Sequence, residues 1–195
     1  GPEKGTGRAV FGADFTAQGS LFGKIVRSPH AHARIVSIDT SAAEATPGVE
    51  AVCTAADFPS EVSGDVDTGE VSIGIQYLAN LIMGRRKVLF EGHPVAAVAA
   101  TDVHIAEEAA RLVKVEYEVL AAVTDPIEAM APDAPLLHEG LLATSLSGTA
   151  DEPSNIANHA EGGRGDVEKG FAESDVIVER TYRTALVHQG YIEPE

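Results

Sequence analysis

A strand–helix–strand pattern that occurs twice along the chain constrains the fold more than any other feature of the sequence. In the first copy, residues 34–39 are typical of a strand, residues 40–48 of a short helix closed by Pro47 and Gly48, and residues 49–55 of a returning strand. Strand–helix–strand connections are usually right-handed crossovers between strands of one sheet. The repeat therefore predicts helices layered on a mixed β-sheet.

The second copy is the more regular one. Residues 94–100 are small and apolar, which suits a strand covered on both faces, and residues 113–119 alternate apolar and polar side chains, as in a strand with one buried face. Between them, residues 101–112 begin with a Thr-Asp cap and predict a helix. Its predicted buried face consists of Ile105, Ala109 and Leu112. A strand expected at 20–28 would join the same sheet.

The rest of the chain is less periodic. Residues 59–74 are rich in Gly, Asp and Ser and predict a loop. A short helix beginning at Asp166 and a β-branched strand at 175–184 are expected near the end. The predicted boundaries are a first domain at 1–131, a linker at 132–164, and the truncated beginning of a second domain at 165–195.

Composition excludes several classes of partner. The chain has 14 Lys and Arg against 30 Asp and Glu, and the net charge of −16 repels both a nucleic-acid backbone and an anionic bilayer surface. With one cysteine, Cys53, it can form no internal disulfide, redox pair or cysteine-ligated iron–sulfur cluster. No stretch approaches the roughly 18 apolar residues of a membrane helix. We therefore expect a cytoplasmic protein that acts on neither nucleic acids nor membranes.

His30 and His32 are the first candidate site residues. They lie two residues apart behind a predicted strand, a spacing that can serve a zinc or copper ion. The sequence offers no thiolate or nearby carboxylate to complete a tetrahedral set. A structural turn after Pro29, with imidazoles bonded to the backbone, is therefore favoured over a metal site.

Two further kinds of cluster favour structural interpretations. Asp65, Asp67 and Glu70 could attract Ca²⁺, but their spacing does not match the twelve-residue calcium loop, so a solvated loop is favoured. The glycine-rich stretches at 5–12 and 161–165 lack the spacing of a phosphate-binding loop and predict turns.

No nucleophilic site is indicated. Cys53 lies in an apolar strand pattern where a thiol is inert, and no serine lies in a G-x-S-x-G elbow. The densest set of polar side chains on a β-like run consists of His188, Gln189, Tyr191 and Glu193. On composition alone, this run is as consistent with an exposed strand end as with the wall of a pocket.

Four stretches together resemble one known family. Residues 6–15, 21–59 and 91–129 resemble the N-terminal α/β hammerhead region of the molybdenum-binding subunit of xanthine dehydrogenase and aldehyde oxidase relatives. Residues 165–194 resemble the entry into the molybdopterin-binding region that follows. The resemblance implies an α+β fold whose first domain is the hammerhead. It also implies a structural role for the two histidines, because "RSPHAHARI" belongs to the hammerhead framework.

The resemblance further implies a molybdenum hydroxylase. In such enzymes a molybdopterin cofactor hydroxylates a heterocycle, an aldehyde or an aromatic thioester, while a buried glutamate acts as general base. Electrons leave through iron–sulfur clusters and in some cases FAD, which are expected on partner chains or segments. By this resemblance, Gln189 is the one candidate for the glutamine that approaches the molybdenum in several members, and so the one cofactor-binding candidate. No catalytic residue and no metal ligand is assigned, since Glu193 lies where the cofactor region begins and the general base comes much later.

By itself, the chain is therefore expected to hold no complete cofactor and to be inactive. It is expected to be a fragment of a large subunit, or a natural split piece completed by a second polypeptide. The strand at 175–184 would then need a partner to cover its edge. The alternative, from a different class of function, is a non-catalytic hammerhead module for interaction or assembly.

Overall fold

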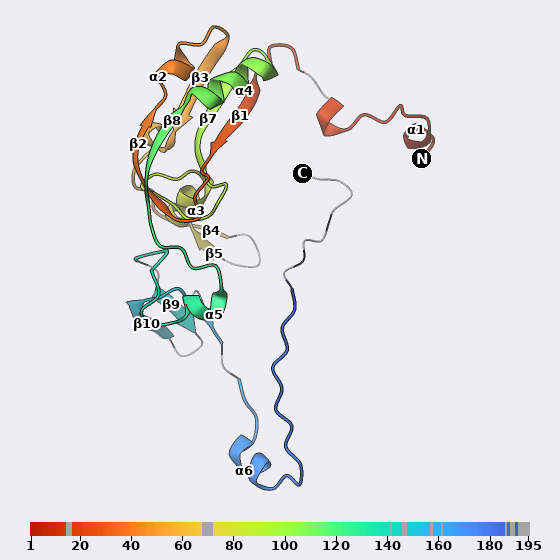
Figure 1. Cartoon of the computed structure of the whole chain (residues 1–195). Coiled ribbons are helices and arrows are strands. Elements are labelled where there is room, and N and C mark those ends of the chain that lie inside the picture. Colours follow the sequence, from red (N-terminus) through yellow and green to blue (C-terminus); the bar gives the residue numbers. More distant parts are fainter. Residues whose placement is uncertain are drawn as a thin grey trace.

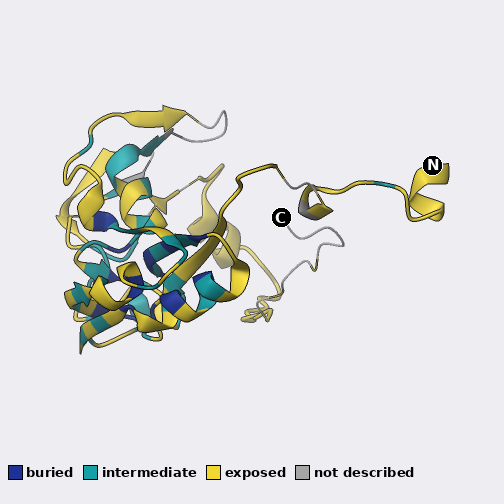
Figure 2. Ribbon diagram, turned by 90° about the horizontal axis from the view of Figure 1, so that it is seen from above, coloured by how far each residue is buried: buried dark blue, intermediate teal, exposed yellow. Residues whose placement is uncertain are grey.

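The structure, a computed structural model, describes residues 1–14, 17–67, 72–140, 142–145, 148–156, 158–160, 162–185, 187 and 190 (Figure 1). An α/β unit, residues 22–119, lies above a smaller unit, residues 126–159, in the view of Figure 1. The N-terminal arm extends away from both units and contains α1 (Pro2–Gly5) and the 3₁₀ helix η1 (Gly12–Asp14). Buried residues gather in the α/β unit, whereas the arm is almost entirely exposed (Figure 2).

Two three-stranded sheets build the α/β unit. The first has the order β1-β7-β3 and the second the order β6-β2-β8, and every neighbouring pair is antiparallel. The strands are β1 (Phe22–Arg27), β2 (Ala33–Asp39), β3 (Val49–Thr54), β6 (Lys87–Val88), β7 (Pro94–Ala100) and β8 (Lys114–Val119).

Both predicted strand–helix–strand copies are present, with α2 (Ser41–Glu44) in the first and α4 (Val103–Leu112) in the second. Each helix, however, connects the two sheets instead of two strands of one sheet. This corrects the mixed sheet expected for this unit. The edges of β7 are already occupied by β1 and β3, so β8, which follows β7 through α4, pairs with β2. The strand predicted at 20–28 does lie in the sheet of β7, as β1.

Helix α4 covers one face of the first sheet. Its N-terminus is capped by Asp102, whose Oδ1 accepts a hydrogen bond from the backbone N–H of His104 at 2.8 Å. The residues that α4 buries are Ala106 and Ala109. Ile105 is half-buried and Leu112 is 43% exposed, so the buried face is rotated from the predicted one. The small alanine side chains at this contact let the helix approach the sheet closely.

The core is made of small side chains in two clusters. One joins β7 to α2 and α4, and it consists of Ala43, Ala96, Val98, Ala109 and Val113. The other joins the two sheets and consists of Ala33, Val88 and Val95. The alternation predicted along 113–119 holds at Val115 and Tyr117, which pack against the second cluster, and fails at Val119, which is 64% exposed.

The stretch predicted as a loop at 59–74 contains more structure than expected. β4 (Asp65–Asp67) pairs antiparallel with β5 (Ser72–Gly74) after the short turn η2 (Ala55–Asp57). α3 (Ile75–Ile82), which was not predicted, follows directly. β4, β5 and α3 lie at the lower end of the α/β unit in the view of Figure 1.

The stretch predicted as a linker, 132–164, contains a small sheet of order β10-β9-β11. β11 runs parallel to β9 and β10 runs antiparallel to it, so mixed pairing occurs here. The strands of this sheet are β9 (Leu142–Ser145), β10 (Gly148–Pro153) and β11 (Asn158–His159). The helix α5 (Pro126–Ala129) precedes the stretch, and α6 (Val167–Ala172) follows it. α6 begins at the predicted cap, Asp166, and the domain boundaries themselves stay predictions.

The strand predicted at 175–184 is not observed. The described residues form no strand there, and Val176, Val178 and Tyr182 are 78%, 74% and 87% exposed. A β-branched sequence becomes a strand only when a neighbouring strand accepts its backbone hydrogen bonds. The described part of the chain supplies no such neighbour at this place.

In the described part of the chain, no helix is long and apolar enough to cross a bilayer.

Candidate functional site

The turn that carries His30 and His32 uses the two imidazoles differently. The His32 ring is 6% exposed, and its Nδ1 lies 2.7 Å from the carbonyl oxygen of Ala121. Because a carbonyl only accepts, Nδ1 carries the proton and donates it. The His30 ring instead packs edge-on against Tyr117, with 5.0 Å between the ring centroids. These contacts support the structural interpretation of both residues.

The backbone of this turn is held by Ser28, which is 2% exposed. Its hydroxyl oxygen accepts from the backbone N–H of His30 at 3.0 Å and donates to the carbonyl oxygen of His30 at 3.2 Å. The backbone N–H of Ser28 donates to the carbonyl oxygen of His93 at 2.9 Å. The "RSPHAHARI" stretch therefore joins β1 to β2 through a fixed turn.

His93 was missed by the sequence reasoning and is fully buried. Its Nδ1 accepts from the backbone N–H of Leu89 at 3.1 Å, so Nε2 carries the proton and donates to the carbonyl oxygen of Asn80 at 2.9 Å. The ring stacks on Phe90 at a centroid distance of 4.5 Å. Burial lowers the pKa of His93 below its ordinary value, and the backbone groups of Asn80 and Leu81 oppose that effect. The only sequence signal was its position before the buried strand β7.

The other candidates do not form a common site within the described residues. Asp65 and Asp67 are exposed at the two ends of β4, while Glu70 lies outside the described residues. Cys53 is half-buried on β3. Within the described part of the chain, no group of three or more His, Cys, Asp or Glu side chains is arranged to hold a metal ion.

The glycine-rich stretch at 5–12 is a turn only in part, because Gly5 ends α1 and Gly12 begins η1, with turn and loop between them. In the arm, Gly7 has a φ of 69°, in the left-handed region that glycine adopts most readily. Gly165 has a φ of 86° just before the cap of α6. The cofactor-binding candidate Gln189 and its neighbours His188, Tyr191 and Glu193 lie outside the described residues.

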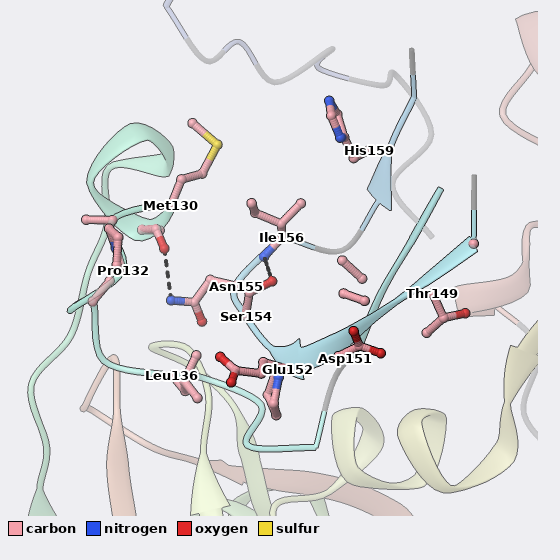
Figure 3. A pocket seen from close by; sticks show the side chains of 17 residues that line it. Met130, Pro132, Leu136, Thr149, Asp151, Glu152, Ser154, Asn155, Ile156 and His159 are labelled. Atoms are coloured by element: carbon pink, nitrogen blue, oxygen red, sulfur yellow. Dashed lines mark hydrogen bonds between the residues drawn. The ribbon is translucent and has the colours of Figure 1, made fainter. Parts of the chain in front are cut away.

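A hollow of about 660 Å³ separates α5 from the small sheet (Figure 3). Its wall carries Met130 and Ile156, with Asp151 and Glu152 from β10. Asn155 holds the wall together: its Nδ2 donates to the carbonyl oxygens of Ala129 and Pro135, each at 3.0 Å. Its Oδ1 accepts from the backbone N–H of Leu137, also at 3.0 Å. The sequence contains no signal for this hollow, because its walls come from segments with no periodicity.

A polar junction ties the small unit to the α/β unit. Lys87 Nζ on β6 donates to the carbonyl oxygen of Leu137 at 3.0 Å and to Oε1 of Glu139 at 3.1 Å. The hydrogen bond from Lys87 lowers the pKa of the Glu139 carboxyl. His138 packs on Tyr77 of α3, and burial, followed by the charge of Lys87, lowers its pKa. These contacts order residues 137–139 against α3 and β6.

The class of protein follows from these contacts. The buried histidines bond to backbone groups of α3 and of the loops that flank two packed antiparallel sheets. The chain thus forms an α+β framework in which these histidines have structural contacts.

Comparison with known proteins identifies that framework. Residues 6–121 match the sequence model of the aldehyde oxidase and xanthine dehydrogenase a/b hammerhead domain. The chain therefore belongs to the aldehyde oxidase and xanthine dehydrogenase family and contains its hammerhead domain. The resemblance and the α+β hammerhead fold predicted from the sequence are confirmed.

Curated relatives are much longer than this chain. The carbon monoxide dehydrogenase large chain of Afipia carboxidovorans is 37% identical over 196 residues, which cover 96% of this chain and 23% of the relative. The nicotine 6-hydroxylase large subunit of Paenarthrobacter nicotinovorans is 32% identical over 187 residues, with 96% and 21% coverage. The chain thus spans less than a quarter of each of these two relatives.

A solved structure gives the same assignment. The crystal structure of the Cu,Mo-CO dehydrogenase in its carbon monoxide reduced state superposes with a TM-score of 0.67 at 37% identity. The superposition covers 90% of this chain and 22% of that one.

The family implies a molybdenum cofactor, and the described residues do not form a site for it. The buried nitrogen donors and acceptors of His93 are used by the backbone, as is Nδ1 of His32, and Lys87 is bound to residues 137 and 139. The one residue predicted to approach the cofactor, Gln189, is outside the described residues. No chemical step is therefore assigned to the described side chains.

Proposed function

We propose that this chain is the hammerhead portion of the large subunit of a molybdenum hydroxylase. The observation that carries the proposal is the family match over residues 6–121, supported by a superposition on a molybdenum enzyme that covers nearly the whole chain. The complete enzyme would hydroxylate a heterocycle, an aldehyde or an aromatic thioester. Molybdopterin, bound by the complete subunit, would supply the oxygen transfer and the two-electron oxidation.

Within that enzyme, the chain's own residues act as a framework. The two sheets and α4 pack around the two core clusters, and the contacts of Lys87 and Asn155 position the segment that leads from them toward residues 165–195. Gln189 would approach the cofactor at the end of that segment. Iron–sulfur clusters and a flavin would lie on partner chains or segments, as the single cysteine of this chain favours. A cytoplasmic location stays a prediction.

Elemental analysis tests the proposal. The chain would be purified alone and after co-expression with the remainder of its reading frame or its neighbouring genes, in medium with and without molybdate. We expect about one molybdenum per completed subunit and none on the chain alone. Stoichiometric metal on the chain alone, or a stable complex without molybdenum from molybdate-supplied cells, would contradict the proposal. The second outcome would favour the non-catalytic assembly module instead.

A further inference from the structure

The first sheet of the α/β unit has one face that nothing in the described structure fully covers. Residues of neighbouring strands that pair directly share a face of the sheet. Two such cross-strand rows lie on the face of the sheet that points away from α4. These rows, called the back face below, are Gly23, Ala99 and Ala51, followed by Ile25, Ala97 and Cys53.

The opposite face is the one that α4 and α2 bury. Its rows include Val26 with Ala96 and Val52 with Val98, all of which belong to or pack against the core cluster around Ala109. Lys24 also lies on that face, where its Nζ donates to Oε1 of Glu107 on α4 at 2.8 Å. The alternation along the strands therefore turns the side chains of the back face away from both helices.

The back face remains accessible in this structure. Ile25 is 40% exposed, Gly23 and Ala51 are exposed, and Ala97, Ala99 and Cys53 are half-buried. The six residues carry no charge, and their only polar group is a thiol. A solvated sheet face has a different composition.

The outer face of the second sheet shows that difference within the same molecule. There Arg34 pairs across the strands with Glu118, and Ser37 donates to Glu116 Oε2 at 3.3 Å. The sequence thus places charged and polar pairs on a sheet face that stays in water. On the back face it places alanine, glycine, isoleucine and cysteine, the composition of a face that is buried in the finished protein.

We propose that the back face, formed by β1, β7 and β3, is the docking surface for an apolar, uncharged segment from the remainder of the same subunit. This inference rests on the proposed function, because its occupant is the rest of a hydroxylase large subunit. The long relatives support that occupant, since more than three-quarters of each lies outside the region this chain matches. A charged partner is disfavoured, because burying a charge against this face would leave the charge without a counterion. The small side chains allow a helix or a sheet layer to approach closely.

Cys53 supplies a direct probe of this docking. N-ethylmaleimide labelling of the Cys53 peptide would be followed by mass spectrometry in the chain alone and in the full-length subunit, with urea-unfolded samples as the reference for complete reactivity. We expect labelling to be slower by about tenfold or more in the full-length subunit, since the thiol would react only after local opening. Equal rates in the two proteins would overturn the proposal. Protection in the chain alone that grows with its concentration would also overturn it, because the occupant would then be a second copy.

Two matched variants separate docking from folding. Ile25→Lys places a charge on the back face, and Val36→Lys makes a comparable change on β2, where the wild-type side chain is 56% exposed. We expect both variants of the chain alone to keep the thermal midpoint of the wild type. In the full-length subunit, Ile25→Lys is expected to restore fast labelling of Cys53, and Val36→Lys is expected to leave it slow. Slow labelling in the Ile25→Lys subunit, or fast labelling in both variants, would overturn the proposal.

Molybdenum analysis of the same wild-type preparation keeps the two proposals distinguishable. A molybdenum-loaded subunit whose Cys53 labels as fast as in the chain alone overturns the docking proposal and leaves the proposed function intact. A subunit without molybdenum whose Cys53 is protected overturns the proposed function and supports the docking surface.

Discussion

Replacing His93 tests the account of the core most directly. The ring is fully buried, makes two hydrogen bonds to backbone groups and stacks on Phe90. In His93→Ala, the unpaired N–H of Leu89 and carbonyl of Asn80 each cost about 1 kcal/mol, because both residues are partly reachable by water. The cavity left by the ring costs about 2 kcal/mol more.

The expected loss is therefore about 4 kcal/mol, a large part of the roughly 5–15 kcal/mol that stabilises a domain. It corresponds to a fall of about 10 °C in the thermal midpoint of a domain of this size. His93→Phe retains the ring volume but not the hydrogen bonds, so we expect about half that loss.

Urea and thermal unfolding followed by circular dichroism would measure both variants against His104→Ala. The His104 side chain is exposed on α4, and its removal is expected to change the free energy of unfolding by about 0.5 kcal/mol or less. If His93→Ala unfolds within about 1 kcal/mol of His104→Ala, the ring does not support the core and the reasoning is refuted.

Three further predictions concern the pH dependence of stability, the cap of α4 and the hydrogen bonds of Asn155. Because burial lowers the pKa of His93, the folded state binds fewer protons than the unfolded state as the pH falls below 6.5, so the free energy of unfolding should be highest above that pH and fall below it. His138 adds a slope of the same sign, so His93→Phe should flatten the dependence of the thermal midpoint on pH without removing it. Asp102→Ala removes the cap of α4 and should cost about 1 kcal/mol in urea unfolding, whereas Asp102→Ser should restore most of it. Asn155→Ala breaks three hydrogen bonds in the smaller unit. Amide exchange at 126–156 should therefore accelerate by about tenfold or more, while exchange in β7 stays unchanged. Acceleration in both regions would contradict the inference that Asn155 stabilises only the smaller unit.

The cofactor candidate and the framework residues could be predicted from the sequence to different degrees. The resemblance alone pointed to Gln189, and that assignment stays a prediction. The interpretation of His30 and His32 as turn residues came from the missing ligand set and agrees with their observed contacts. His93 could not be found, since a histidine before a buried strand has no periodicity that distinguishes a core position from a surface one.

Local features of the sequence determined the elements themselves. The cap at Asp102, the small apolar run of β7 and the cap at Asp166 each act within a few residues, so the pattern predicts the element wherever it lies in space. The family resemblance, which is spread over most of the chain, determined the fold class.

Only the tertiary structure decided which strands pair and which faces are covered. β7 lies between β1 and β3, which come from distant parts of the chain, and that placement turned both predicted crossovers into connections between two sheets. Residues 175–184 have strand propensity without a strand, because pairing requires a neighbour that the described chain does not supply. The physical reason is the same in both cases: a helix satisfies its hydrogen bonds internally, whereas a strand depends on residues that its own sequence does not specify.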